Sequence, residues 1–315
     1  MKKLCAIAAF VIGFAAPAAA DTVAGGFTSF FALGDSLTDD GKLGAGVLAA
    51  PSDGGRFSNG PTWAELVAKR FSSAGLSTAN FALGGATAQG PDLTPAAGLG
   101  RLSTLSGQIG AFGDSLSGLT TGNNPLTAVW FGANDLFSSF ESSNVIAAAE
   151  AVETGIRNIA AVGQTLGVEL NDFLVPNLPD LGASPRYGKL LELGGATPAE
   201  IAFLSGQANA ATDLFNTELS ARMDTLRSEG LNILDLDTNT LFADLLDAIK
   251  TAPGSAEAYG LLDADTPCTV SLSAPLSGQT NPFTCAPGTE NLLLFSDAVH
   301  PNAIGHQVLA ENTRV

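Results

Sequence analysis

The sequence predicts an α/β fold in which one parallel sheet is covered by helices on both faces. Three observations support this prediction. Short apolar runs alternate with long helical patterns along the chain. The apolar runs are continuous, which is typical of strands buried on both faces. The order of strand, helix and strand recurs through all five runs, which favours crossover connections between parallel strands in one large domain.

Five apolar runs of five or six residues are the strand candidates. They span Ser29 to Leu33, Thr78 to Leu83, Leu126 to Phe131, Leu170 to Val175 and Asn232 to Leu236. In a parallel sheet, ligand sites form just beyond the carboxyl ends of the strands. The residues at those places are Gly34-Asp35-Ser36, Gly84-Gly85 and Gly132-Ala133-Asn134-Asp135.

Amphipathic patterns fill the intervals between the strands. The helix candidates are Pro61 to Phe71, Leu102 to Leu116, Asn144 to Leu166 and Pro198 to Glu229, with a C-terminal helix from Pro301 through Leu309. The fourth begins with a capping box, Thr197-Pro198-Ala199-Glu200, and ends at Gly230. The segments Ala86 to Gly100 and Thr251 to Glu290 are rich in Gly, Ala, Ser and Pro and are predicted to be loops.

Residues 1–20 have the pattern of a secretory signal peptide. Lys2 and Lys3 precede an apolar run that ends in Ala-Ala-Ala before Asp21. A membrane anchor is less favoured because it needs about 20 apolar residues with different flanks. The sequence therefore predicts a secreted or periplasmic protein whose mature domain is residues 21–315, with no transmembrane segment.

The remaining chain is strongly acidic. Without Lys2 and Lys3 it has 12 basic and 31 acidic residues, a net charge of −19. Such a surface repels nucleic acids and anionic membranes, so neither is an expected partner. Cys268 and Cys285 are the only cysteines outside the leader. In an oxidising compartment a disulfide is favoured over two free thiols, and a metal site is disfavoured because no Cys or His partners sit at ligand spacing.

The tetrapeptide Gly-Asp-Ser-Leu occurs twice, at 34–37 and at 113–116. The first copy follows a predicted strand, where the N–H groups of a tight turn can face an anion. The second lies beside the apolar stripe of an amphipathic helix, where a serine lacks such a turn. Ser36 is therefore the candidate nucleophile and Ser115 a helical residue. On the tetrapeptide alone an ordinary surface turn is favoured, because short motifs of common residues are weak signals; the rest of the chain changes this.

A Ser-His mechanism has few possible partners, because the chain has only two histidines. His300 closes the stretch Ser296-Asp297-Ala298-Val299-His300, in which Asp297 can bend back to orient the imidazole. Pro301 is expected to begin the last helix, with His300 at its exposed cap. His306 lies inside that helix and is interpreted as a surface or packing residue.

Acyl transfer also needs donors for an oxyanion. The candidates are the backbone N–H groups of Ser36 and Gly85 and the side-chain amide of Asn134. Gly85 lacks a side chain, so substrate can approach its backbone, although it could be an ordinary turn glycine. Asn134 could instead cap a helix.

With Ser36, Gly85, Asn134 and the pair Asp297 and His300 in this order, the chain resembles the GDSL (SGNH) lipase/esterase family. The match spans the whole predicted mature domain. The branch described as phospholipase, lecithinase or haemolysin-like is similar in the blocks GDSLTDDG, GGRFSNGPTWAE, NFALGGAT, FGANDL, VPNLPDLGASP and LLFSDAVHPNAIGHQVLAE.

The resemblance implies a flavodoxin-like three-layer α/β/α sandwich with a five-stranded parallel sheet, the SGNH hydrolase fold. It implies hydrolysis of carboxylic esters through an acyl-enzyme, with no cofactor and no metal. Ser36 would be the nucleophile, His300 the general base and then acid, and Asp297 its orienting partner, with Ser36, Gly85 and Asn134 as oxyanion donors. No Gly-x-Ser-x-Gly occurs, which argues against the elbow of the α/β-hydrolases.

Several interpretations of function stay open. The expected partner is a small-molecule or lipid ester, and the 18 Phe residues mildly favour an apolar acyl pocket. The alternatives are a carbohydrate acetyl esterase and a non-catalytic secreted binding or adhesion domain of the same fold. Members of this branch often carry a C-terminal autotransporter barrel. The chain ends at Val315, soon after its last predicted helix, which favours a free secreted enzyme or a truncated passenger.

Overall fold

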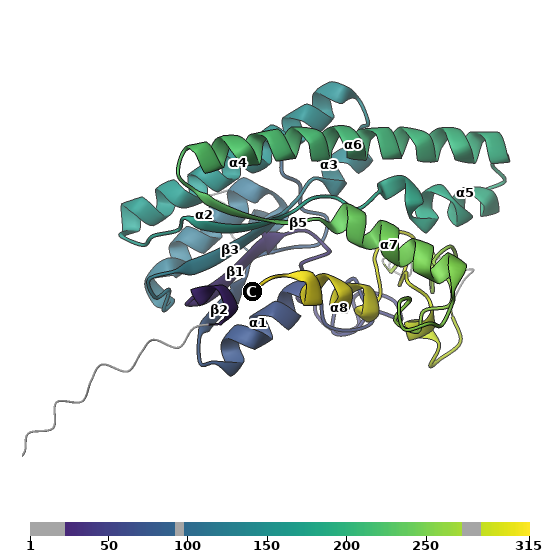
Figure 1. Cartoon of the computed structure of the whole chain (residues 1–315), viewed down its shortest axis with the longest axis horizontal. Helices are drawn as coiled ribbons and strands as arrows, with labels where there is room; N and C mark the ends of the chain where they lie inside the picture. Colours follow the sequence, from purple (N-terminus) through teal and green to yellow (C-terminus); the bar gives the residue numbers. More distant parts are fainter. Residues whose placement is uncertain (1–22, 92–97, 273–284) are drawn as a thin grey trace, which may run out of the picture.

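A five-stranded parallel sheet forms the centre of the molecule (Figure 1). The computed structural model describes residues 23–91, 98–272 and 285–315. The strands are β1 (Ser29–Gly34), β2 (Ser77–Asn80), β3 (Pro125–Trp130), β4 (Asp172–Pro176) and β5 (Asn232–Leu236). They lie in the order β2-β1-β3-β4-β5, and every neighbouring pair is parallel. This is the strand order of flavodoxin-like sheets, so the predicted fold class is confirmed.

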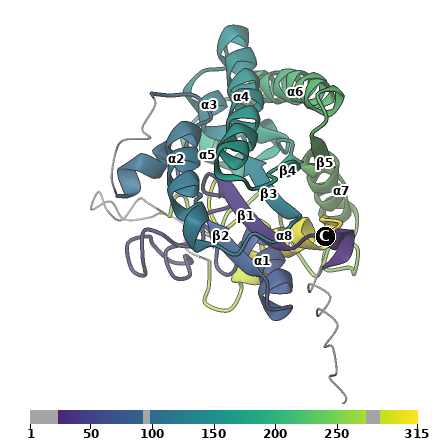
Figure 2. The ribbon, with the colours of Figure 1, turned by 90° about the vertical axis from the view of Figure 1, so that its left-hand side faces the viewer.

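Helices cover both faces of the sheet, as Figures 1 and 2 show from two directions. One layer contains α2 (Leu105–Ser115), α4 (Ser142–Leu166) and α6 (Pro198–Ser228). The opposite layer contains α1 (Trp63–Ser73) and α8 (Ala303–Asn312), with α7 (Thr238–Thr251) packed beside α8. The result is a three-layer α/β/α sandwich.

Burial differs between the central and the edge strands. Every residue of β1 and β3 is buried, as their continuous apolar runs predict. All four residues of β2 are only half-buried, and β5 has exposed positions at Asn232 and Asp235. The expectation that all five strands are buried on both faces is therefore wrong for the two edge strands, which have a neighbour on one side only.

Capping residues set the helix boundaries. The predicted capping box of α6 is present, since Glu200 N–H donates to Thr197 Oγ1 at 3.3 Å and Thr197 N–H donates to Glu200 Oε2 at 2.8 Å. Helix α2 begins at Leu105 rather than Leu102 because Thr104 accepts a hydrogen bond from Gly107 N–H. The preceding residues form a short 3₁₀ turn, Leu99–Ser103.

Sequence analysis missed three helices. They are α3 (Ala133–Ser138), α5 (Lys189–Leu193) and α7. The first two are only six and five residues long, too short to show a period. Helix α7 had a usable signal, because Asp237 caps it and its buried residues Phe242, Leu245 and Ile249 recur at helical spacing.

Other predictions fall partly outside the described residues. The proposed signal peptide lies there, as do 92–97 and 273–284 within the two predicted loops. Cys268 and Cys285 form a disulfide, as expected. Within 23–91, 98–272 and 285–315, the helices include none with the length and apolarity needed to cross a membrane.

Candidate active site

The turn after β1 presents Ser36 at the carboxyl edge of the sheet. Thr38 and Asp39 both donate their N–H groups to the carbonyl of Asp35, at 3.0 and 2.9 Å, so the chain reverses within four residues. Ser36 is 8% exposed. Its N–H has no acceptor among the residues that the structure describes. The turn therefore keeps both the hydroxyl and the N–H of Ser36 at the carboxyl edge of the sheet, where sequence analysis expects the nucleophile.

A second turn delivers Asp297 and His300. Ser296 N–H donates to the carbonyl of His300 at 2.8 Å, which closes the turn. The expectation that Pro301 begins the last helix is wrong. Asn302 is the cap and accepts from Gly305 N–H at 2.9 Å, so α8 starts at Ala303. His300 thus precedes the helix, and its side chain is 12% exposed rather than lying at an open cap.

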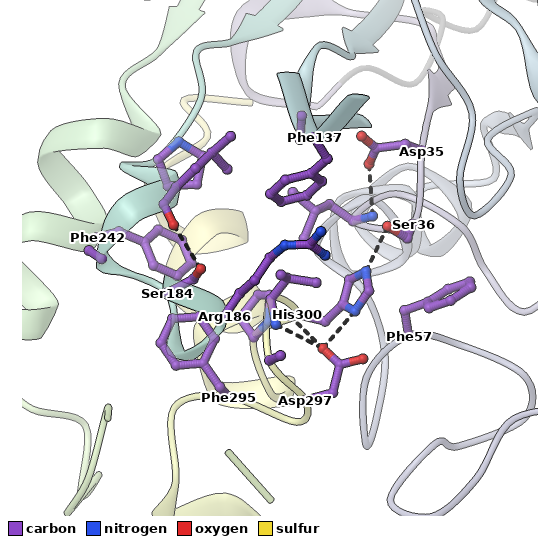
Figure 3. A pocket seen from close by; sticks show the side chains of 18 of the residues that line it. Asp35, Ser36, Phe57, Phe137, Ser184, Arg186, Phe242, Phe295, Asp297 and His300 are labelled. Carbon is purple, nitrogen blue, oxygen red and sulfur yellow. Dashed lines mark hydrogen bonds and ion pairs between the residues drawn. The ribbon is translucent and has the colours of Figure 1, made fainter. Parts of the chain in front are cut away.

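The two turns meet in a line of hydrogen bonds (Figure 3). His300 Nε2 lies 2.8 Å from Ser36 Oγ, and His300 Nδ1 lies 2.8 Å from Asp297 Oδ1. Burial would raise the pKa of the Asp297 carboxyl, but the imidazole of His300 and two backbone N–H groups outweigh it and hold that pKa below its ordinary value. Asp297 therefore stays ionised and can stabilise a positive imidazole.

The segment around Gly85 is fixed on both sides. Past Asn80 the chain still follows β1, with Leu83 N–H donating to Gly34 O at 3.1 Å. Asp39 Oδ2 accepts from Gly84 N–H at 2.8 Å. Gly85 itself has a φ of +82°, which favours glycine, and its N–H has no acceptor within the described chain. A preorganised, unused N–H is what an oxyanion site requires.

Asn134 clamps the other side of this segment. It lies in the first turn of α3, whose cap is Gly132, so the alternative that Asn134 is a helix cap is wrong. Its Nδ2 donates to Ala86 O at 2.9 Å and reaches Asp35 Oδ2 at 3.4 Å. The second contact is long, which leaves one N–H of the amide weakly engaged and close to the loop that carries Ser36.

Two buried carboxyl groups support the site and were not predicted. Asp135 accepts from Ala88 and Gln89 N–H at 2.8 and 3.0 Å, which fixes the chain beyond Gly85. Asp35 accepts from Leu37 N–H at 3.0 Å. Burial raises the pKa of Asp35 to about 7, and the charge of Asp135 adds to the rise. No pattern in the sequence marked these carboxyl groups as buried.

The other candidates are structural. Ser115 ends α2 and donates its hydroxyl to Ala111 O at 2.8 Å, as expected of a helical serine. His306 is fully buried and its Nδ1 accepts from Trp63 N–H at 3.3 Å. Burial lowers the pKa of His306 to about 3, so this ring is neutral. Sequence analysis interpreted His306 as either a surface or a packing residue, and its burial shows that it is a packing residue.

The disulfide lies beside the turn that carries His300. Cys268 N–H donates to Phe295 O at 2.9 Å, and Leu272 N–H donates to Asp297 Oδ2 at 3.3 Å. The bridge joins Cys268 to Cys285 across a separation of 17 residues. The disulfide therefore fixes the segment from Cys268 to Leu272, which contacts Asp297.

A pocket of about 460 Å³ opens over Ser36 and His300. Gly85 and Asn134 also line this pocket. Its walls are mostly apolar, and several come from the helices that sequence analysis missed: Phe137 from α3, Leu190 from α5, and Phe242 and Leu246 from α7.

Phe57 and Arg186 are further pocket residues without a predicted role. The ring of Phe57 lies 5.0 Å from that of His300, centroid to centroid, and a Cβ at Gly84 would overlap it. Phe57 therefore shields one side of the imidazole. Phe57 falls in a block that carries the family resemblance and Arg186 directly follows another, but nothing in the sequence placed them at the pocket.

Fold and site together define a class of protein, an α/β/α sandwich with serine, histidine and aspartate hydrogen-bonded in line at the carboxyl edge of its sheet. The chain matches the family described as GDSL-like lipase/acylhydrolase over residues 30–313. It belongs to that family.

Two curated relatives are similar in sequence. A thermolabile hemolysin of Vibrio parahaemolyticus is 27% identical over 292 residues, which cover 89% of this chain and 61% of the hemolysin. A phosphatidylcholine-sterol acyltransferase of Aeromonas hydrophila is 32% identical over 174 residues, 53% of this chain and 49% of the acyltransferase. The chain thus matches less than two thirds of the length of either relative.

Solved structures of similar fold include a lipase from a goat rumen metagenome and an acetylxylan esterase from Geobacillus stearothermophilus. The lipase is 13% identical with a TM-score of 0.45, covering 91% of this chain and 95% of that one. The esterase is 13% identical with a TM-score of 0.40, covering 90% and 91%.

Proposed function

We propose that the protein is a secreted serine esterase or lipase that cleaves carboxylic esters through an acyl-enzyme on Ser36. One observation carries the proposal. Ser36 Oγ, His300 and Asp297 form an unbroken line of hydrogen bonds, each 2.8 Å long, in the pocket. A serine with an oriented base beside it is the arrangement that nucleophilic catalysis requires.

In the first half of the reaction, Ser36 Oγ attacks the ester carbonyl carbon while His300 Nε2 takes the hydroxyl proton. The carbonyl oxygen becomes an oxyanion, which the N–H groups of Ser36 and Gly85 and the amide of Asn134 would stabilise. The carbon–oxygen bond to the alcohol then breaks, and His300 gives its proton to the departing alcohol. The acyl group is left on Ser36 as an ester.

In the second half, water replaces the alcohol. His300 removes a proton from water as the water oxygen attacks the acyl carbon, and returns it to Ser36 Oγ as the carboxylic acid leaves. Asp297 holds the imidazole in the required tautomer and balances its charge in both halves. The enzyme is restored without a cofactor.

The pocket favours an acyl chain over a sugar. Phe137, Phe242 and Leu246 are among the residues that line it, and such a wall binds a hydrocarbon chain by excluding water. The name of the Vibrio relative, thermolabile hemolysin, fits an enzyme that attacks membrane lipids. The substrate class we propose is therefore a lipid or other ester with an apolar acyl group, with acetylated carbohydrate as the alternative.

The proposed secretion rests on residues 1–20 and on the disulfide. Two lysines followed by an apolar run and Ala-Ala-Ala form an export signal, and a disulfide between Cys268 and Cys285 is stable in an oxidising compartment. Mass spectrometry of protein recovered from the periplasm or medium tests this directly. An N-terminus at or near Asp21 is expected, and a full-length N-terminus would contradict it.

The test of the proposed activity combines labelling with a substrate panel. A fluorophosphonate probe should label Ser36 in the native enzyme, and peptide mapping should show no label on Ser115. Nitrophenyl esters of increasing chain length, a phospholipid and acetylated xylan then define the substrate. Preference for acetylated xylan would select the carbohydrate esterase alternative. Absence of both labelling and hydrolysis in the folded protein would select the non-catalytic binding domain.

A further inference from the structure

Arg186 is placed beside the catalytic residues by its backbone. It belongs to the short 3₁₀ turn Pro185–Tyr187, and its N–H donates to Ala298 O at 2.9 Å. Ala298 lies between Asp297 and His300 in sequence. The position of Arg186 is therefore tied directly to the turn that carries the general base.

The side chain is held over the pocket. The guanidinium carbon lies 4.7 Å from the ring centroid of Phe137 and 5.9 Å from that of Tyr187. Phe137 is on α3, the helix that also carries Asn134. Figure 3 shows the side chain of Arg186 extending from the Ser184 turn toward Phe137 and the catalytic histidine. Arg186 also interacts with the hydroxyl of Tyr187, a neutral partner, so these aromatic contacts orient the guanidinium without neutralising its charge.

Within the part of the chain that the structure describes, the charge of Arg186 lacks a carboxylate partner. Among the described residues, five other arginines form ion pairs with Asp or Glu: Arg56, Arg101, Arg157, Arg222 and Arg227. No ion pair of Arg186 occurs in that part of the chain, although the sequence has 31 acidic residues against 14 basic. Arg186 is also the only lysine or arginine among the described residues that line the pocket. A cation left unpaired in so acidic a chain is available to a ligand.

The carboxyl groups that line the pocket have hydrogen-bond partners other than Arg186. Asp297 is hydrogen-bonded to His300, and Asp180 accepts from Gly182 N–H at 3.1 Å. Burial raises the pKa of both Asp35 and Asp180. The carboxyl groups of the pocket are thus hydrogen-bonded to other described residues and form no ion pair with Arg186 among them.

We propose that Arg186 binds an anionic group, a phosphate or a carboxylate, on the substrate ester close to the bond that is cleaved. This inference rests on the proposed function, because it assigns the substrate of the same site. The planar guanidinium can form two parallel hydrogen bonds to either anion. The apolar wall would receive the acyl chain while Arg186 holds the charged end, so the pair of features selects amphiphilic esters.

The kinetic test compares two esters that differ by one anionic phosphate group, 1-octanoyl-glycerol and 1-octanoyl-glycerol 3-phosphate. In Arg186→Gln, kcat/KM should fall roughly 10-fold to 100-fold more for the phosphate ester than for the neutral one, mainly through KM. Arg186→Lys should restore part of the loss. Lys189→Gln is the matched control, since this nearby lysine pairs with Glu192 outside the pocket and its loss should change neither ester.

A binding measurement keeps the inference independent of turnover. Calorimetry on Ser36→Ala should show octyl phosphate binding more tightly than octanol, and a second change, Arg186→Gln, should remove the difference. Inorganic phosphate competing with octyl phosphate would show that the free anion suffices for binding. Equal losses on both esters, or unchanged selectivity in Arg186→Gln, would overturn the role of Arg186. If the native enzyme cleaves neither ester, the proposed activity fails, and the calorimetry alone decides the anion site.

Discussion

The two copies of Gly-Asp-Ser-Leu have the same letters and different chemistry. In the first, Ser36 follows a buried strand and its hydroxyl lies 2.8 Å from His300 Nε2. In the second, Ser115 ends a helix and its hydroxyl donates to Ala111 O. Asp35 is 2% exposed, whereas the side chain of Asp114 is 72% exposed and pairs with Arg101. The element that precedes each tetrapeptide, a buried strand or a helix, decides what surrounds its serine.

The sharpest test of this contrast is the pair Ser36→Ala and Ser115→Ala. The first removes the proposed nucleophile and should lower kcat by roughly 10⁴-fold or more. The second removes a hydroxyl that only bonds its own helix, so kcat should stay within about a factor of two. Steady-state hydrolysis of a nitrophenyl ester measures both, with circular dichroism to verify folding. Equal losses in two folded variants would contradict the contrast.

The second test removes a contact that only the first copy has. Asn134→Ala deletes an amide that reaches Asp35 and the segment beside Gly85. Loss of one oxyanion donor should lower kcat by roughly 10²-fold to 10³-fold with a small change in KM. Asn124→Ala, on an asparagine at the far end of β3, is the control and should leave kcat unchanged. A defect confined to KM would instead make Asn134 a substrate-binding residue.

The third test compares the aspartates of the two tetrapeptides, Asp35 and Asp114. The raised pKa of Asp35, about 7 against an ordinary 3.8, means that the folded state favours its neutral form. This contribution to stability is complete below pH 3.8 and is lost as the pH rises to about 7. Between those values, the free energy of unfolding of Asp35→Asn should therefore rise relative to wild type, by an amount on the order of a few kcal/mol.

Urea denaturation at pH 5 and pH 8 measures this difference. Asp114→Asn is the control, because an exposed ion pair contributes only about 0–1 kcal/mol to stability. Parallel stability curves for wild type and Asp35→Asn would show that the carboxyl of Asp35 is ionised throughout.

The smallest expected effect concerns the first glycine of each tetrapeptide, Gly34 and Gly113. A Cβ at Gly34 would lie 2.7 Å from Thr38 Oγ1 and 3.1 Å from Trp130 O, so Gly34→Ala should cost roughly 1–3 kcal/mol of stability. A Cβ at Gly113 would meet only Val162, at 3.2 Å, and alanine is about 1 kcal/mol better than glycine in a helix. Gly113→Ala should therefore change the free energy of unfolding by less than about 1 kcal/mol. Thermal denaturation that ranks the two variants in the reverse order would contradict this.

The sequence predicted the sheet better than the pocket. Strands β1, β3 and β4 are continuous apolar runs, and their burial makes such runs easy to recognise. Residues Ser36, Gly85 and Asn134 could be found because each follows a strand, and one sheet edge brings them together. His300 and Asp297 were found from their spacing and from the scarcity of histidine.

The pocket walls could not be predicted in the same way. Phe137 and Leu190 lie on helices of six and five residues, which carry no detectable period. The buried state of Asp35 and the unpaired charge of Arg186 depend on neighbours that are distant in the chain. Periodicity reports on the repeating parts of a fold, whereas the features that select a substrate are local and do not repeat.

The contact between Ser36 and His300 joins positions 264 residues apart. Two further hydrogen bonds join the same ends of the chain, from Trp63 to His306 and from Arg70 to Val315. A ribosome delivers Ser36 early in synthesis and His300 late, so under the proposed mechanism a nascent chain holds a nucleophile long before it holds the base. Under that mechanism, ester hydrolysis would report synthesis of the chain as far as His300. A chain interrupted anywhere before His300 would be silent, however well its sheet has formed.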